Sequence, residues 1–456
     1  MLLDKVFQPF IEETPICVMA RAVLQRLLDP KQIDHLFTRN ARSQYTHELL
    51  FSSLVDLMSR VVIGQEPSVY AAYRKLEHLL PVSDQSIYNK LQHIELPVAA
   101  ALVNDSALRV EPVIQALKAT LPPLVPGYRV RFLDGNHLAA TEHRLKELRC
   151  TWAAPLPGTV LAVLDQELRT VTDVLLTEDG HAQERSLLEH VIPLVDRNDI
   201  WVADRNFCTL NLLTGIADHQ GFFAIRQHGQ LEGELLGERV CKGRCETGHV
   251  YEQRLRLCTQ HGRILAVRRV TIILDKPTRD GDTEIHILTN LSAKKVSALK
   301  IAAVYRQRWT IEGLFFEVEQ TLSCEINTLC YPKAALFAFC LGLVVSNAVA
   351  LIKAALRAKH GREKVQQSLS AYYLVLEIQQ TYRGMMVAIP PPHWKIFETL
   401  SGSDFAAVLQ ELAEHVALDR YRKTRRGPKK PPPQKKRYKN GEHIATAKVL
   451  ADRQKR

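Results

Sequence analysis

None of the short motifs that mark several large enzyme classes occurs in this sequence. It contains no GxxxxGK(S/T) phosphate-binding loop, no HExxH zinc pair and no GxSxG nucleophile turn. No repeat of the period that builds solenoids or propellers is present. These absences argue against a P-loop nucleotidase, a zincin protease, an α/β-hydrolase and a repeat protein.

Cysteine is sparse, with nine residues scattered over 456 positions, and no secretory signal is present. We therefore expect reduced thiols in a cytosol rather than a disulfide framework. Cys241, Cys245 and His249, followed by Cys258 and His261, contain enough groups for a zinc site, but their spacing matches no closed zinc motif. Buried or incidental thiols in a β-rich region are the better interpretation.

One stretch of nineteen residues, 334–352, carries no charge and reaches the minimum length of a membrane span. It contains Ser346 and Asn347, has no aromatic belt, and continues into Lys353 and Arg357. We expect a helix packed against a central sheet, with no membrane partner.

The net charge of +11 is concentrated near the C-terminus. Residues 420–439 contain eleven Lys or Arg and no acid, whereas the rest of the chain has 49 residues of each sign. Because this segment is rich in proline and repels itself, the sequence predicts a disordered basic tail over residues 419–456. We expect the tail to bind the phosphate backbone of DNA through Arg425, Arg426, Lys429 and Lys430. A solubilising end is the alternative.

Residues 1–125 have a helical pattern, which predicts a helical N-terminal domain that ends in Leu121-Pro122-Pro123; DNA binding by this domain is expected from the helix pair within it. Within it, residues 66–80 and 83–94 form a plausible helix-turn-helix, whose second helix Ser83 or Asp84 can cap. Among the polar residues of that helix, Gln85, Asn89 and Lys90 are candidates to contact base edges and phosphates. An ordinary helix pair of a bundle remains the alternative.

Residues 126–360 change to an α/β pattern. Residues 128–138, 159–168 and 170–177 are expected to form strands, followed by a helix over 181–195 and a further strand ending at Asp204. Residues 221–291 are again rich in strand-like runs, and residues 361–418 are expected to form a helical C-terminal region. Arginines in the 221–291 stretch are consistent either with DNA contacts or with an exposed sheet face.

The most informative segment is YRQRWTIEGLFFEVE, in which Tyr305, Arg308 and Glu312 are spaced by three and four residues. In a continuous helix these three side chains fall within roughly 60° of arc, so that a phenol, a guanidinium and a carboxylate share one face. The apolar residues that fall on the other side, toward a core, are Val304, Ile311, Leu314, Val318 and Leu322.

Two apolar runs upstream each end in an aspartate. Residues 128–133 stop at Asp134, with Gly135 as the expected break, and residues 200–203 stop at Asp204. Two strand ends and one helix would then deliver Asp134, Asp204 and Glu312 to one site, which suits two Mg²⁺ or Mn²⁺ ions and phosphodiester displacement. The alternatives are turn or cap aspartates and a solvated helix-surface pair.

These motifs, LDGNH, ADRNF and Tyr305-x2-Arg308-x3-Glu312 with Trp309 inside it, resemble the insertion sequence 4 family of DDE transposases. The resemblance covers roughly residues 125–355. It implies a ribonuclease-H-like catalytic core with a β-rich insertion over 221–291, and Asp134, Asp204 and Glu312 as the catalytic, metal-binding triad. It further implies that Tyr305 and Arg308 bind phosphates at the transposon end and that Trp309 helps to hold a distorted base.

The sequence departs from this family at one position. The family signature places a lysine seven residues after the glutamate, and here that residue is Glu319. A carboxylate cannot replace the contact of a cation with phosphate. Either another basic residue makes this contact, or the protein processes the transposon end differently or less efficiently.

The resulting hypothesis is a DNA transposase that cleaves the ends of its insertion sequence and joins the 3′-hydroxyls to target DNA. Its expected partners are double-stranded DNA, at element ends and target, and a second copy in a synaptic homodimer. Excision through a DNA hairpin is consistent with the resemblance, although Glu319 weakens that step. The competing hypotheses are a structure-selective nuclease on the same core and a non-catalytic DNA-binding repressor derived from a transposase.

Overall fold

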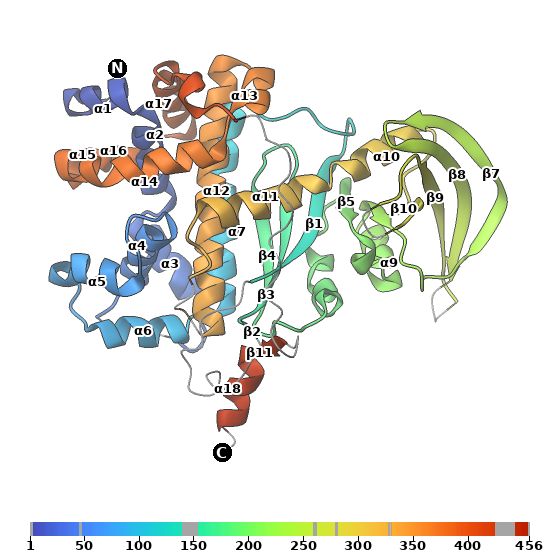
Figure 1. Ribbon diagram of the computed structural model, residues 1–456, viewed down its shortest axis with the longest axis horizontal. Coiled ribbons are helices and arrows are strands. Elements are labelled where there is room, and N and C mark those ends of the chain that lie inside the picture. The colour runs from blue at the N-terminus through green and yellow to red at the C-terminus, as the bar shows by residue number, and fades with distance from the viewer. Residues whose placement is uncertain are drawn as a thin grey trace.

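The structure is a computed structural model that describes residues 3–44, 48–138, 154–258, 262–278, 281–326, 329, 331–424 and 443–454. Arg425, Arg426, Lys429 and Lys430, which we expect to contact DNA, lie outside the described residues. The described chain is a mixed α/β fold, in which helices from both ends of the sequence gather on one side of a long sheet (Figure 1).

The N-terminal region is helical, as its pattern predicts. Its helices are α1 (Gln8–Glu13), α2 (Pro15–Leu27), α3 (Pro30–Asn40), α4 (Phe51–Val62), α5 (Val69–Leu76), α6 (Asp84–Gln92) and α7 (Leu96–Ala116), with the short 3-10 helices η1 (Lys5–Phe7) and η2 (Glu77–Leu79). The expected helix-turn-helix is α5 and α6. Ser83 caps α6, because its side chain accepts a hydrogen bond from the Ser86 amide.

The C-terminal region is also mainly helical. It comprises α12 (Pro332–His360), α13 (Arg362–Ser368), α14 (Ala371–Ala388), α15 (Pro391–Trp394), α16 (Ile396–Thr399), α17 (Gly402–Glu414), η6 (Leu418–Tyr421) and α18 (Thr446–Gln454). Between α17 and α18, the short strand β11 (His443–Ala445) pairs in parallel with β2 (Ala154–Leu156).

The main sheet has nine strands in the order β4-β3-β1-β5-β6-β10-β9-β8-β7. Their bounds are β1 (Arg129–His137), β3 (Thr159–Asp165), β4 (Val171–Thr177), β5 (Asp199–Ala203), β6 (Phe222–Arg226), β7 (Glu234–Cys245), β8 (Gly248–Cys258), β9 (Ile264–Leu274) and β10 (Glu284–Thr289), and the helix α9 (Leu210–Asp218) connects β5 to β6. β1 is antiparallel to β3 and parallel to β5, and β5 is parallel to β6. The β-rich stretch 221–291, which contains β6 to β10, therefore extends the central sheet beyond β5.

One local prediction needs correction. The expected helix over 181–195 is instead two 3-10 helices, η3 (Glu184–His190) and η4 (Ile192–Leu194). Pro193 contributes to the interruption, because proline has no amide hydrogen to donate to the preceding turn. Of the two expected ends of the first strand, Asp134 and residue 138, the second agrees with β1, which continues to His137 because residues 135–137 stay paired with β3.

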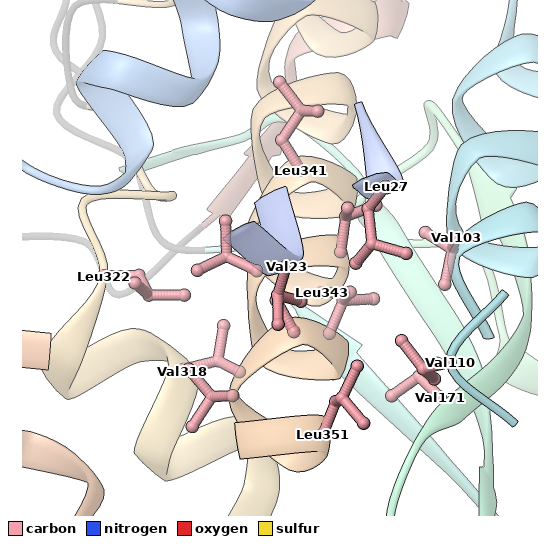
Figure 2. Packing of buried hydrophobic residues seen from close by; sticks show 14 of the residues in the cluster. Val23, Leu27, Val103, Val110, Val171, Val318, Leu322, Leu341, Leu343 and Leu351 are labelled. Atoms are coloured by element: carbon pink, nitrogen blue, oxygen red, sulfur yellow. The ribbon is translucent and has the colours of Figure 1, made fainter. Parts of the chain in front are cut away.

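The hydrophobic core is centred on α12, the helix that covers the uncharged stretch of the sequence. Figure 2 shows side chains from several elements gathered around it, among them Val23 and Leu27 of α2, Val103 and Val110 of α7, Val171 of β4, and Leu341, Leu343 and Leu351 of α12 itself. α12 is long and apolar enough to cross a membrane, but 94% of its most apolar window is buried inside the protein. The predicted packing of this helix against the sheet is confirmed by its contacts with β4.

Candidate active site

The two aspartates lie side by side where the parallel pairing of β1 with β5 ends. β1 and β5 pair in a register that places Leu133 opposite Ala203, so that Asp134 and Asp204 are the next residues on the two strands. Asp204 begins the 3-10 helix η5 (Arg205–Phe207). The carboxyl ends of adjacent parallel strands are a common location for functional groups, because their side chains meet at one edge of the sheet.

The segment that carries Tyr305, Arg308 and Glu312 is two helices, not the single helix predicted. α10 (Ala298–Arg306) contains Tyr305, whereas α11 (Trp309–Thr321) contains Glu312, and Arg308 is the N-cap of α11. The Arg308 amide bonds to the Tyr305 carbonyl at 3.0 Å, a tighter i to i−3 contact than in an α-helix. The predicted apolar side is largely correct: Val304, Ile311, Val318 and Leu322 are buried and Leu314 is half-buried.

Despite the break, direct contacts join the helical residues to the strand residues. Arg308 Nη1 donates to Asp134 Oδ2 at 3.0 Å, and Arg308 Nη2 lies 2.6 Å from Glu312 Oε1. The Tyr305 hydroxyl donates to Asp204 Oδ1 at 3.3 Å. The five residues therefore form one cluster, in which the buried guanidinium of Arg308 links the end of β1 to α11.

The electrostatics of this cluster are those of crowded carboxylates. Burial raises the pKa of Asp134 to about 7, with Glu312 and Glu184 adding to the shift and Arg308 and the Gly135 amide opposing it. Burial alone would lower the pKa of Arg308, but Tyr305, Asp134 and Glu312 stabilise its charge and raise the pKa. The site is a buried negative cluster that needs positive charge beside it.

The described residues include no group of three or more His, Cys, Asp or Glu side chains arranged to hold a metal ion. The guanidinium of Arg308 lies between Asp134 and Glu312, and its Nε is buried without a hydrogen-bond partner. Carboxylate oxygens are nonetheless the donors that Mg²⁺ and Mn²⁺ prefer. The residues fit a hard divalent ion in chemistry, and Arg308 is the group that such an ion would displace.

Glu184 is a member of the site that the sequence interpretation missed. It lies at the start of η3, where burial raises its pKa, and Asn206 bonds to its side chain. A Cβ atom placed on Gly135 would lie 1.8 Å from Glu184 Oε1, so this carboxylate packs directly on the backbone beside Asp134. No motif marks Glu184, and the predicted α-helix gave no reason to choose it among the acids there.

Two other acids near the motifs have structural partners. Asp165 pairs with Arg129 and accepts hydrogen bonds from the Glu167 and Leu168 amides, both at 2.9 Å. Glu317 Oε1 lies 2.6 Å from Lys353 Nζ.

Glu319, which stands where the family has a lysine, lies next to this site. Asn136, two residues after Asp134, donates through its side-chain amide to Glu319 Oε1 at 2.9 Å. The departure from the family pattern therefore puts an additional carboxylate beside the end of β1.

Trp309 extends the cluster to the surface. Its side chain is 64% exposed, and the Arg308 guanidinium lies 5.2 Å from the ring centroid, within cation–π range. Phe316, two turns further along α11, is 59% exposed.

The candidate DNA-contacting residues of α6 belong to a different part of the molecule, where α6 packs against α12. Gln85 and Asn89 are exposed and joined by a 2.9 Å hydrogen bond from Gln85 Nε2 to Asn89 Oδ1. Lys90 Nζ lies 4.7 Å from the centroid of the buried Phe37 ring, and burial lowers its pKa. The exposed residues Gln85 and Asn89 form the accessible polar face of α6.

The cysteine cluster does not assemble a metal site within the described ranges. Cys241 and Cys258 are exposed on β7 and β8, Cys245 is half-buried, and His249 contacts Arg244 Nη1 at 3.1 Å. His261 lies outside the described residues. The expectation of buried thiols does not hold for Cys241 and Cys258, which are exposed.

Comparisons with known proteins address the same region. Residues 126–347 match a family described as the transposase DDE domain. "Putative transposase y4zB" of Sinorhizobium fredii is 30% identical over 132 residues, which cover 28% of this chain and 35% of that protein. The chain thus spans about a third of the length of this relative.

Among solved structures, a cryo-EM structure of the piggyBac transposase synaptic complex with hairpin DNA is similar over 88% of this chain and 81% of that chain. Its sequence identity is 10% and its TM-score is 0.33, which is too distant to support an argument. The matched residues 126–347 include Asp134, Asp204 and Glu312. Over this stretch the chain matches the DDE domain of transposases.

Proposed function

We propose that this protein is a DNA transposase of the insertion sequence 4 family, which cleaves at the ends of its element and joins the 3′-hydroxyl ends to target DNA. The observation that carries the proposal is the cluster that Asp134, Asp204 and Glu312 form with Tyr305 and Arg308, inside the stretch that matches the transposase DDE domain. A binding protein has no need of three carboxylates in one cluster.

In this proposal the catalytic core is ribonuclease-H-like. Support comes from the arrangement of β4, β3 and β1 as antiparallel neighbours, followed in the sheet by the parallel strands β5 and β6. The long hairpin strands β7, β8 and β9 are inserted between Asp204 and Glu312 in the sequence.

Asp134, Asp204 and Glu312 would hold two Mg²⁺ or Mn²⁺ ions. When bound, such ions activate a water or a 3′-hydroxyl and stabilise the leaving oxygen of a phosphodiester. The protein residues supply the geometry: the paired strands β1 and β5 fix the two aspartates, and α11 brings Glu312 to them.

Tyr305 and Arg308 would bind phosphates of the DNA end. Arg308 leaves Asp134 and Glu312 when those carboxylates take other ligands, and its guanidinium is then free to pair with a phosphate beside the exposed ring of Trp309. In this role Trp309 stacks on a distorted base of the transposon end.

Binding to double-stranded DNA would also use surfaces away from the cluster. We assign end recognition to the exposed polar face of α6, with Gln85 and Asn89, and non-specific phosphate contacts to the basic tail, with Arg425, Arg426, Lys429 and Lys430. Synapsis of two ends requires a homodimer on DNA in the bacterial cytosol.

The test uses purified protein and a supercoiled plasmid that carries the native flanks of the gene, with and without Mg²⁺. We expect Mg²⁺-dependent cuts at discrete flank positions that disappear in Glu312→Ala, and joined products that a nuclease would not form. The matched control is Gln320→Ala, which removes an exposed polar side chain from the same helix. Binding without cutting by the wild type would contradict the proposal and favour a repressor.

A further inference from the structure

The 3-10 helix η3 contacts the chain just after both aspartates. The Glu184 carboxylate fills the position that a Cβ atom on residue 135 would occupy, immediately beyond Asp134. The same side chain is hydrogen-bonded to Asn206, two residues beyond Asp204. One side chain therefore bridges the two strand ends from which the candidate catalytic groups project.

Arg185 strengthens this bridge from the next position of η3. Its Nε donates to the backbone carbonyl of Asn206 at 2.8 Å. Asn206 is thus held by Glu184 at its side chain and by Arg185 at its backbone, which fixes the turn that follows Asp204.

Glu184 is not a side chain buried inside the core. It lines a cavity of about 680 Å³, together with Arg185, Asn206 and His137. Placing a half-buried carboxylate there has a desolvation cost, which the Asn206 hydrogen bond and the nearby His137 partly offset. A merely space-filling role would be met by an apolar residue without that cost.

We propose that Glu184 is a positioning residue that sets Asp134 against Asp204 by packing on Gly135 and bonding to Asn206. This inference rests on the proposed function, because it concerns the geometry in which the two aspartates bind divalent ions. It also explains Gly135, since any side chain at that position would displace the Glu184 carboxylate. Residues that orient metal-binding groups typically change metal affinity 10- to 100-fold when mutated.

The test measures Mn²⁺ affinity of the full-length protein by electron paramagnetic resonance titration, without DNA. We expect Glu184→Ala to weaken Mn²⁺ binding at least about tenfold. Glu184→Gln keeps an oxygen that can accept from Asn206 and should bind within about threefold of wild type. Glu189→Ala, which removes an exposed acid of the same helix, is the matched control and should bind as wild type.

Gly135→Ala provides an independent variant, because it moves the Glu184 carboxylate without removing it. Gly135→Ala should weaken Mn²⁺ binding about as much as Glu184→Ala does. The double variant should bind Mn²⁺ no more weakly than either single variant, because both changes remove the same contact. Near-additive losses would contradict the inference. Thermal unfolding of each variant without metal identifies any variant that fails to fold. If Glu184→Ala does not fold, the Mn²⁺ affinity of Gly135→Ala tests the inference.

Two outcomes would overturn the inference while leaving the proposed function intact, provided that Asp204→Asn still abolishes Mn²⁺ binding. The first is wild-type affinity in both Glu184→Ala and Gly135→Ala. The second is equal weakening by Glu184→Gln and Glu184→Ala, which would show that the negative charge acts directly. Failure of the wild type to bind Mn²⁺ would contradict the proposed function itself.

Discussion

Arg308 is the residue on which the charge balance of the candidate site depends. It contacts Asp134 at 3.0 Å and Glu312 at 2.6 Å, and only 7% of its surface is exposed. Removing one partner of a buried ion pair is costly, because it leaves the other charges desolvated and unpaired. Arg308 therefore stabilises the fold in the absence of other cations, at the position where divalent ions would bind.

Arg308→Ala should lower the free energy of unfolding by about 1–3 kcal/mol in EDTA. This loss is smaller than is usual for a broken buried ion pair, because Asp134 can take up a proton and lose its charge. Because the variant no longer competes for the carboxylates, Mn²⁺ should raise its melting temperature more than that of the wild type. Thermal unfolding with and without Mn²⁺ measures both effects. Equal Mn²⁺ stabilisation of the two proteins would contradict this account of Arg308.

The pKa of Asp134 makes a second prediction at the residue scale. Since the folded-state pKa of about 7 lies above the ordinary value of 3.8, the folded protein binds the proton more tightly than the unfolded chain does. The contribution of Asp134 to stability is therefore greatest below pH 4 and falls as the pH rises to 7. Asp134→Asn removes this dependence.

Without metal, the stability of Asp134→Asn relative to wild type should improve by about 2–4 kcal/mol between pH 4 and pH 7.5. Urea unfolding of both proteins at the two pH values measures this change. A stability difference that is constant with pH would show that Asp134 is not held in this environment.

At the scale of elements, the buried polar residue Asn347 ties α12 to two of its neighbours. Asn347 is fully buried, and it bonds to Ser106 Oγ at 2.8 Å, the Val171 carbonyl at 2.9 Å and the Val171 amide at 2.8 Å. These bonds connect α12 to α7 and to β4, the strand next to β3 in the central sheet.

Asn347→Ala should lower the free energy of unfolding by about 2–4 kcal/mol, because it removes the bonds of Asn347 to the buried amide and carbonyl of Val171 and leaves the Ser106 hydroxyl with only its bond to the Val103 carbonyl. Ser346→Ala, at the adjacent half-buried position, should cost less than about 1 kcal/mol. Urea denaturation of the two variants makes the comparison. Equal losses would mean that the hydrogen bonds of Asn347 do not stabilise the contact of α12 with β4.

The elements also show what sequence reasoning can and cannot supply. Strand length and residue type located β1 and β5 to within a few residues, and parallel pairing then brought Asp134 and Asp204 together. The break between α10 and α11 could not be predicted, because residues 304–311 include no glycine or proline. Glu184 could not be selected either, since its role depends on contacts with Gly135 and Asn206 that only the tertiary fold creates.

At the scale of the whole molecule, the candidate site lies between two dissimilar parts. The helices packed around α12 occupy one side of the sheet's β1 region, and the long strands β7, β8 and β9 occupy the far end (Figure 1). Many arginines of the latter strands are already paired, for example Arg256 with Glu234 and Arg268 with Glu252, both at 2.8 Å. The sequence therefore places most of its unbalanced positive charge in the basic tail.

Replacing Arg425, Arg426, Lys429 and Lys430 with glutamine should weaken DNA binding and reduce its dependence on salt. If all four contact phosphates, the slope of log affinity against log salt concentration should fall by roughly 3–4, because fewer counterions are released. Fluorescence anisotropy with a labelled duplex over a range of salt concentrations measures the slope. An unchanged slope would identify the tail as a solubilising segment instead.

The most direct test of the account is strand transfer by a precleaved end. A duplex that carries the terminal sequence of the element and a free 3′-hydroxyl is incubated with supercoiled plasmid and Mg²⁺, using wild type and Asp204→Asn. We predict joined duplex–plasmid products with the wild type and a loss of about a thousandfold or more in the variant. Plasmid cleavage without joining, or joining that Asp204→Asn leaves intact, would contradict the account.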